Sequence, residues 1–246
     1  MSTYSLLQVS LDQMIDRESL EEASEKVPSV TRADCALIQR DLFGIVMSGL
    51  PLEDATAFQA ALMGKEFPTE IVADDEIPVL HEPFTIQRIE IRKNGLVFTD
   101  TMGRENFRPI EELVFVAGGF ITQTKMKSEL VPETTAWNHS RESSYTVGLE
   151  RKFRSLEVPE FRLDFFFWSA PHRLRAAVSA EGMMFFQGRP LRLRDTALLL
   201  GAMMDLRELL PGERVGSGLK RSDTQSAYPS LRSYEEEIRW HFYRLG

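Results

Sequence analysis

The sequence is poor in the residues that form disulfides and bind metals: its 246 residues include one cysteine, Cys35, and four histidines. A single cysteine excludes an internal disulfide and a zinc site built from several cysteines, and it fits a reducing compartment. A lone cysteine in a helical pattern is more often a small core residue than a nucleophile, so we expect Cys35 to be buried. The histidines are scattered, and none has the two-histidine spacing of a helical metal site. We therefore expect neither a metal nor another cofactor.

Long apolar runs and familiar catalytic motifs are also missing. No stretch approaches the roughly 20 apolar residues that a membrane-spanning helix needs. The first residues have no positively charged lead, so we expect no secretory signal and a cytoplasmic location. There is no phosphate-binding loop, no Gly-x-Gly-x-x-Gly and no Gly-x-Ser-x-Gly. The sequence thus specifies no reaction and predicts no catalytic residue, although a pair of distant carboxylates would leave no mark in it.

Charge is distributed unevenly along the chain, whose net charge is −8. Residues 1–86 carry 5 basic against 16 acidic side chains, residues 87–150 carry 8 against 9, and residues 151–246 carry 16 against 12. The acidic first part would repel phosphates, so we expect no nucleic-acid binding there. The basic last part either receives an anion or attracts the acidic first part.

Residues 1–77 predict an acidic α/β module. Thr31 stands where an N-cap is needed, and Asp34 lies near the positive end of the helix that follows. The predicted segments are, in order, a strand at 4–10, a helix at 17–27, a helix from Thr31 to Gly44, a strand at 44–47, a helix from Pro51 with Ala55, Phe58, Ala61 and Leu62 as its core stripe, and a strand at 69–72.

The resulting order, β-α-α-β-α-β, and the segment from Pro51 to Val72 resemble the C-terminal domain of the bacterial ribosomal stalk protein. In that family a helix beginning acid-Asp-Ala runs to a leucine and leads into the last strand. Here Glu53-Asp54-Ala55, Leu62 and Phe67-Pro68 stand in the matching places. The resemblance implies the fold but not the function, because the family binds its factors through lysines on two helices that are acidic here. We expect an adapter or docking unit.

A linker at 78–86 and a β-rich domain at 87–246 are expected next. Alternating residues around Ile89 and a turn at 93–95 predict a hairpin, and short strands continue to residue 117. Residues 123–158 lose periodicity, which predicts a long loop. Strand alternation then resumes at 161–168.

The last third of the sequence predicts more strands and two helices. In the strand at 161–168, the core face is expected to hold Phe161, Leu163, Phe165 and Phe167. The later segments are a hairpin over 172–187 with its turn at 180–182, a helix that Asp195 caps and that runs through Leu209, a loop at 212–229, and a terminal helix at about 231–245 that starts with a capping box of Ser233 and Glu236.

The predicted fold class is therefore α+β. An N-terminal β-α-α-β-α-β module precedes an antiparallel β-rich domain with C-terminal helices. In element order alone, this second domain is similar to the pleckstrin-homology-like (PH-like) architecture, a sheet closed by a helix.

Arginines around the last hairpin mark a candidate site for an anionic ligand, because the planar guanidinium suits phosphate or carboxylate. They are Arg173, Arg175, Arg189, Arg192 and Arg194. The alternative is that these side chains point to water or pair with the acidic module. Trp168 and Phe242 are candidate contacts for a protein partner.

These patterns favour a non-catalytic binding or adapter protein that recognises a protein partner or an anionic ligand. One alternative is an enzyme of unidentified type with its site at the join of the two domains. Another is a structural component of an assembly, held by the terminal helix. A homo-oligomer is a separate alternative for its partner.

Overall fold

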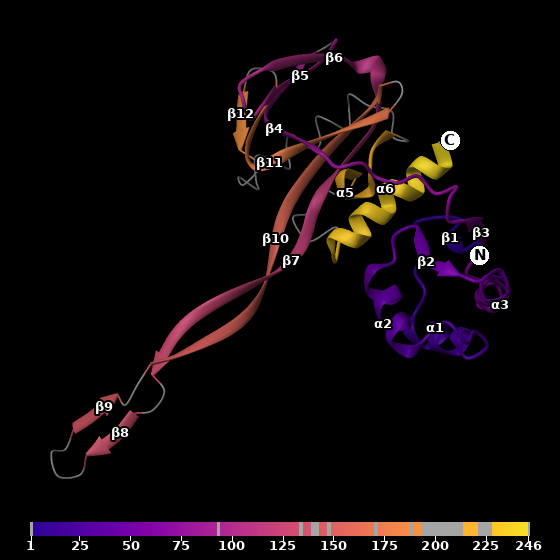
Figure 1. The fold of residues 1–246 in the computed structure, drawn as a ribbon, viewed down its shortest axis with the longest axis horizontal. Coiled ribbons are helices and arrows are strands. Elements are labelled where there is room, and N and C mark those ends of the chain that lie inside the picture. The colour runs from indigo at the N-terminus through magenta and orange to yellow at the C-terminus, as the bar shows by residue number, and fades with distance from the viewer. Residues whose placement is uncertain are drawn as a thin grey trace.

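The computed structural model describes residues 2–92, 94–132, 135–138, 143–146, 149–169, 172–186, 189–192, 214–220 and 228–245. They contain both helices and antiparallel sheets, so the predicted α+β class is confirmed (Figure 1). Within them, no helix is both long and apolar enough to cross a membrane. The predicted helix at 195–209 lies outside the described residues.

The N-terminal unit has the predicted order of elements. They are β1 (Tyr4–Gln8), α1 (Arg17–Ser24), α2 (Arg32–Asp41), β2 (Ile45–Leu50), α3 (Leu52–Met63) and β3 (Thr69–Ala73). Strand β1 is the centre of a three-stranded antiparallel sheet, β2-β1-β3. Thr31 caps α2 as predicted: its hydroxyl accepts a hydrogen bond from the Asp34 amide, and the Asp34 carboxylate accepts one from the Thr31 amide. Cys35 is fully buried in the core of this unit, which confirms its predicted place.

A larger sheet follows, with seven strands among the described residues. They are β4 (Phe84–Arg92), β5 (Gly95–Asp100), β6 (Glu105–Pro109), β7 (Leu113–Pro132), β10 (Leu149–Ser169), β11 (His172–Phe186) and β12 (Arg189–Arg192), with a 3-10 turn, η1 (Ile110–Glu112), before β7. The order is β6-β5-β4-β11-β10-β7, and β12 pairs with β11. Phe161, Leu163, Phe165 and Phe167 share one core cluster, as strand alternation predicted.

The predicted hairpin over 172–187 is wrong, because β11 is one continuous strand. Its two halves both pair in parallel with β4, from Ala176 to Val178 and again from Met183 to Phe186, with an irregular register between them. Residues 180–182 therefore interrupt the pairing of β11 with β4 and do not form a turn between two strands. The parallel partner begins at Phe84, far away in the sequence, and local periodicity could not reveal it.

The long loop predicted at 123–158 is also not what the structure has. Strands β7 and β10 pair without interruption from Thr122 with Pro159 to Pro132 with Leu149, and they project from the body as a two-stranded ribbon (Figure 1). We call residues 122–132 and 149–159 the arm. Near its end lie two further paired strands, β8 (Thr135–Asn138) and β9 (Ser143–Thr146). At about 3.3 Å per residue, the arm is about 35 Å long.

The C-terminal helix α6 (Leu231–Leu245) lies between the N-terminal unit and the large sheet (Figure 1). Tyr234, Ile238 and Phe242 pack against the large sheet in one apolar cluster. Trp240 and Tyr243 pack on the other side, against the small sheet. A short helix α5 (Ser217–Lys220) and a bridge from Tyr228 to Ile121 replace part of the loop expected at 212–229. Helix α6 thus joins the two sheets.

Candidate functional site

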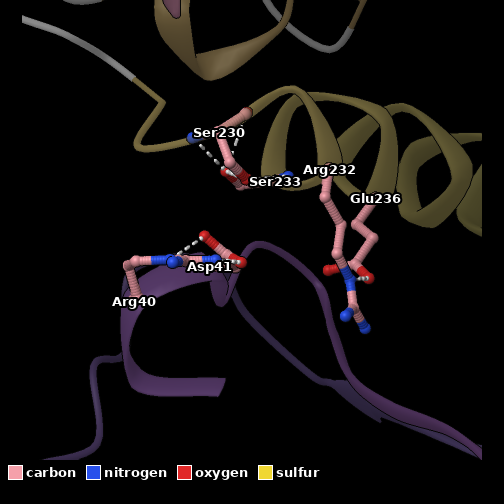
Figure 2. Close-up of polar contacts among 6 residues, drawn as sticks. All are labelled: Arg40, Asp41, Ser230, Arg232, Ser233 and Glu236. Carbon is pink, nitrogen blue, oxygen red and sulfur yellow. Dashed lines mark hydrogen bonds and ion pairs between the residues drawn. The ribbon is translucent and has the colours of Figure 1, made fainter. Parts of the chain in front are cut away.

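The C-terminal end of α2 faces the N-terminal end of α6 across a polar seam (Figure 2). Asp41, the last residue of α2, is 4% exposed. Its carboxylate accepts two hydrogen bonds from the Arg40 guanidinium, at 2.9 Å from Nε and 2.6 Å from Nη2. Such a bidentate pair is the geometry in which arginine holds a carboxylate most firmly.

The facing end of α6 is capped by two serines. The Ser230 amide donates to the Ser233 hydroxyl, and the Ser233 amide donates to the Ser230 hydroxyl, both at 3.1 Å (Figure 2). The predicted capping box of Ser233 and Glu236 is therefore wrong by one turn, because the helix begins at Leu231. Glu236 instead accepts a hydrogen bond from Arg232 Nε at 2.6 Å.

The two carboxyl groups of the seam have opposite pKa shifts. Burial opposes the ionisation of Asp41, but hydrogen bonds from Arg40 and Ser230 and the charges of Arg40 and Arg232 outweigh it and lower its pKa. Burial raises the pKa of Glu236, and the hydrogen bond and charge of Arg232 compensate only in part. Asp41 is thus a firmly ionised group, and Glu236 is more easily protonated.

A cavity of about 190 Å³ opens beside the seam. Its charged lining is Asp34, Asp41, Arg232 and Glu236, and its other lining residues include Ser48, Leu37 and Met47. All three carboxylates are already hydrogen bonded, Asp34 to the cap of α2 and the others to arginines. In the described part of the chain, no group of three or more His, Cys, Asp and Glu residues is placed to hold a metal ion. The cavity thus has room for a small ligand, and the carboxylates that line it are engaged by a helix cap or by Arg40 and Arg232.

A second cavity, of about 410 Å³, lies at the other side of α2. It is lined by residues 11–15, by Pro229 and by four residues around the end of α2, namely Gln39, Arg40, Leu42 and Phe43. Arg40 is the charged group that it shares with the seam, and Met14 at its rim is exposed. The lining lacks histidine, so it offers little for proton transfer near neutral pH.

A buried network ties α5 to α6. The Glu237 carboxylate, in a residue that is 1% exposed, accepts hydrogen bonds from the Ser217 amide at 2.7 Å and from the Tyr228 hydroxyl, and His241 Nε2 lies 3.5 Å away. Burial opposes ionisation of Glu237, but the nearby His241 and the hydrogen bond from Tyr228 outweigh it and lower its pKa. Burial and the charge of Glu237 raise the pKa of Tyr228 well above 10.0. None of these groups lines either of the two cavities described above.

A second buried carboxylate, Asp164 on β10, is likewise closed off from solvent. The Tyr234 hydroxyl donates to it at 3.0 Å, and Arg162 Nε lies 3.4 Å away. These contacts hold α6 on the large sheet. Asp164 lines neither cavity and therefore offers no catalytic carboxylate to a substrate there.

The arm carries an apolar face in full contact with solvent. Directly paired residues of an antiparallel ladder share a face, so Met126 with Ser155, Ser128 with Phe153, and Leu130 with Arg151 lie on one side of the ribbon. Met126 is 66% exposed, and Leu130 and Phe153 are each 62% exposed. We call this side the apolar face of the arm.

The opposite side of the arm is charged. Lys125 pairs with Glu160 at 3.1 Å, and Lys127 pairs with Glu129 at 3.0 Å. Arg154 lies directly opposite Lys127 in the ladder. Ion pairs make most of this side compatible with water, although Leu156, which is 43% exposed, lies here opposite Lys125.

The predicted anion site falls on strands whose side chains lie outside the described part. Arg173 and Arg175 of β11 pair with Trp168 and Phe166, whereas Arg189 and Arg192 of β12 pair with Phe186 and Met183 at the other end of β11. Arg194 is outside the described residues. The anion site stays a prediction.

The two predicted partner contacts have different outcomes. Trp168 lies on β10, and its side chain is outside the described part. Phe242 is 2% exposed, in edge contact with Phe166 at 4.9 Å between ring centroids and with Phe115 at 5.9 Å. Its expected role as a partner contact is wrong for the folded chain, because α6 docks on its own large sheet.

Sequence reasoning missed the arm residues. Met126, Leu130 and Phe153 stand among lysines, serines and glutamates, and that mixture suggested a loop. Three consecutive polar residues separate Met126 from Leu130, so this segment lacks the alternation that predicts a strand.

Comparison of the chain with protein-family models, with curated proteins and with solved structures finds no match.

Proposed function

We propose that the protein is a non-catalytic binding protein, an adapter, that contacts a protein partner in the cytoplasm through the apolar face of its arm. The observation that carries this proposal is the exposure of Met126, Leu130 and Phe153 on a ribbon that no other described element covers. A two-stranded ribbon is marginally stable in water by itself, and a second layer would stabilise it. A partner that supplies this layer would gain the apolar contacts that water now occupies.

The rest of the fold fits an adapter. The β-α-α-β-α-β order of the first unit supports its proposed likeness to the stalk-protein domain as a docking unit. The helix on which the proposed PH-like likeness of the second part rests, at 195–209, lies outside the described residues, so this likeness stays a proposal. An enzyme at the join is less well supported, because the carboxylates beside the 190 Å³ cavity are engaged by a helix cap or by arginines.

The test is to compare what the tagged protein retains from its native cells with what two variants retain. Met126→Asp combined with Phe153→Asp places charge on the apolar face, and Arg154→Asp is the matched control on the opposite face. We expect the wild type and the control to retain the same proteins and the double variant to lose at least one. Mass spectrometry counts the chain itself separately from other proteins. An unchanged set of proteins in all three samples would refute the proposal.

A further inference from the structure

We infer that the partner of the apolar face is the same face of a second copy of this chain. The inference rests on the proposed function, since it names the occupant of the surface proposed there. It is carried by the register of β7 with β10. When two arms stack apolar face to apolar face and run in opposite directions, this register places complementary side chains opposite each other.

We place the two-fold axis of this arrangement at the pair of Lys127 and Arg154. Lys127 pairs with Arg154, and both side chains lie on the charged side. An axis that runs across the apolar face at the level of this pair places β7 opposite β7 and β10 opposite β10. Residues equally far from the pair on either side then face each other across the interface.

This axis places a large side chain opposite a small one at the centre. Met126 faces Ser128 of the second copy, and Phe153 faces Ser155 of the second copy. Because Ser128 pairs with Phe153 within one ladder, each methionine also comes beside the phenylalanine of the other copy. Sulfur and aromatic rings attract each other, and alternation of large and small groups lets stacked sheets interdigitate about 10 Å apart.

The same axis matches charge. Arg151 faces Glu157 of the second copy, and the symmetry makes this contact twice. Both side chains are exposed, and within the described residues neither has an ion-pair partner. Leu130 faces Thr124 of the second copy. Stacking in the same direction would instead place Arg151 on Leu130, so complementarity selects the opposed arrangement.

Charge reversal tests the inference without changing the apolar groups. In Arg151→Glu alone and in Glu157→Arg alone, both symmetric contacts become repulsive. We expect each to dimerise about tenfold more weakly than the wild type, since two exposed ion pairs are replaced by like charges. In an equimolar mixture of the two variants, both contacts between unlike copies are again of opposite charge. Sedimentation velocity over a range of concentrations should therefore show dimers restored in the mixture.

Arg154→Glu is the matched control on the charged side of the same strand, and it should dimerise like the wild type. Circular dichroism checks that all variants are folded. A wild type that stays monomeric at every concentration, or a mixture no more dimeric than its components, would overturn the inference. If the wild type is monomeric and the Met126→Asp, Phe153→Asp variant still loses a different protein, the inference fails and the proposed binding function stands.

Discussion

Trp240 lies so close to Gly44 that a Cβ on the glycine would be 2.5 Å from the tryptophan Cβ and Cγ. Gly44 has a φ of +87°, which side-chain-bearing residues rarely adopt. Trp240 Nε1 also donates a hydrogen bond to the Gln8 carbonyl at 2.7 Å. The C-terminal helix thus packs against the N-terminal unit at Gly44, where a residue with a side chain would be strained.

Gly44→Ala should lower the free energy of unfolding by about 2–4 kcal/mol, because it adds backbone strain and a contact with Trp240. Gly49→Ala is the matched control, since Gly49 has a φ of +80° and nothing within 4 Å of its Cβ position. The control should cost only the strain, about 1–2 kcal/mol. Urea denaturation measures both. Equal losses would mean that the contact with Trp240 contributes nothing.

Glu237 should make stability fall in acid. Its pKa in the folded protein is below the ordinary value of 4.5, so its contribution is present above about that pH and is lost as the pH falls through the lower folded value. Glu237→Gln should therefore cost about 1–3 kcal/mol at neutral pH and progressively less in acid. Denaturation curves across this pH range give the difference. A cost that does not change with pH would contradict a role for the charge.

The seam carboxyl groups should respond to pH in opposite ways. Asp41 has a lowered pKa, so its contribution exists above its ordinary value of 3.8 and disappears in acid. Glu236 has a raised pKa, so its contribution exists below its ordinary value of 4.5 and is lost as the pH rises through the folded value. Relative to the wild type, Asp41→Asn should become less stable as the pH rises and Glu236→Gln more stable. Parallel trends for the two variants would show that the assignment is wrong.

The predicted anion site is tested by phosphate. If the arginines of β11 and β12 bind an anion, millimolar phosphate should raise the melting temperature of the wild type, because a ligand that binds only the folded state stabilises it. Arg173→Ala combined with Arg175→Ala should reduce the shift, and Arg154→Ala on the arm should leave it intact. Sodium chloride at equal ionic strength controls for salt. Absence of any shift in the wild type would end this hypothesis.

Local signals were enough to predict the N-terminal unit. Prolines and glycines mark the ends of its helices, and Thr31 marks the start of α2. The predicted apolar stripe of α3 includes Ala55, Phe58 and Leu62, and these three residues are buried. The alternation over 161–168 correctly predicted the four residues that share one core cluster, although Asp164 and Phe166 on the other face are buried too. Where one face is buried, the pattern follows the structure.

The arm and the seam could not be predicted in this way. The arm is solvated on both faces, so no burial imposes a clear alternation on residues such as Lys127 and Phe153. The seam brings Asp41 beside Ser230, which are joined by tertiary packing alone. The capping box was misplaced because Ser230 and Ser233 cap each other, whereas the sequence offered the more familiar Ser-x-x-Glu pattern.

The place of α6 between the two sheets also sets the order in which the molecule is completed during synthesis. Chains fold from the N-terminus as they leave the ribosome, yet the helix that covers Ile45 on one sheet and Phe166 on the other is made from residues 231–245. Until those residues emerge, both apolar surfaces lack this cover. A chain that ends before α6 would expose both apolar surfaces, and cellular quality control would recognise it at either surface.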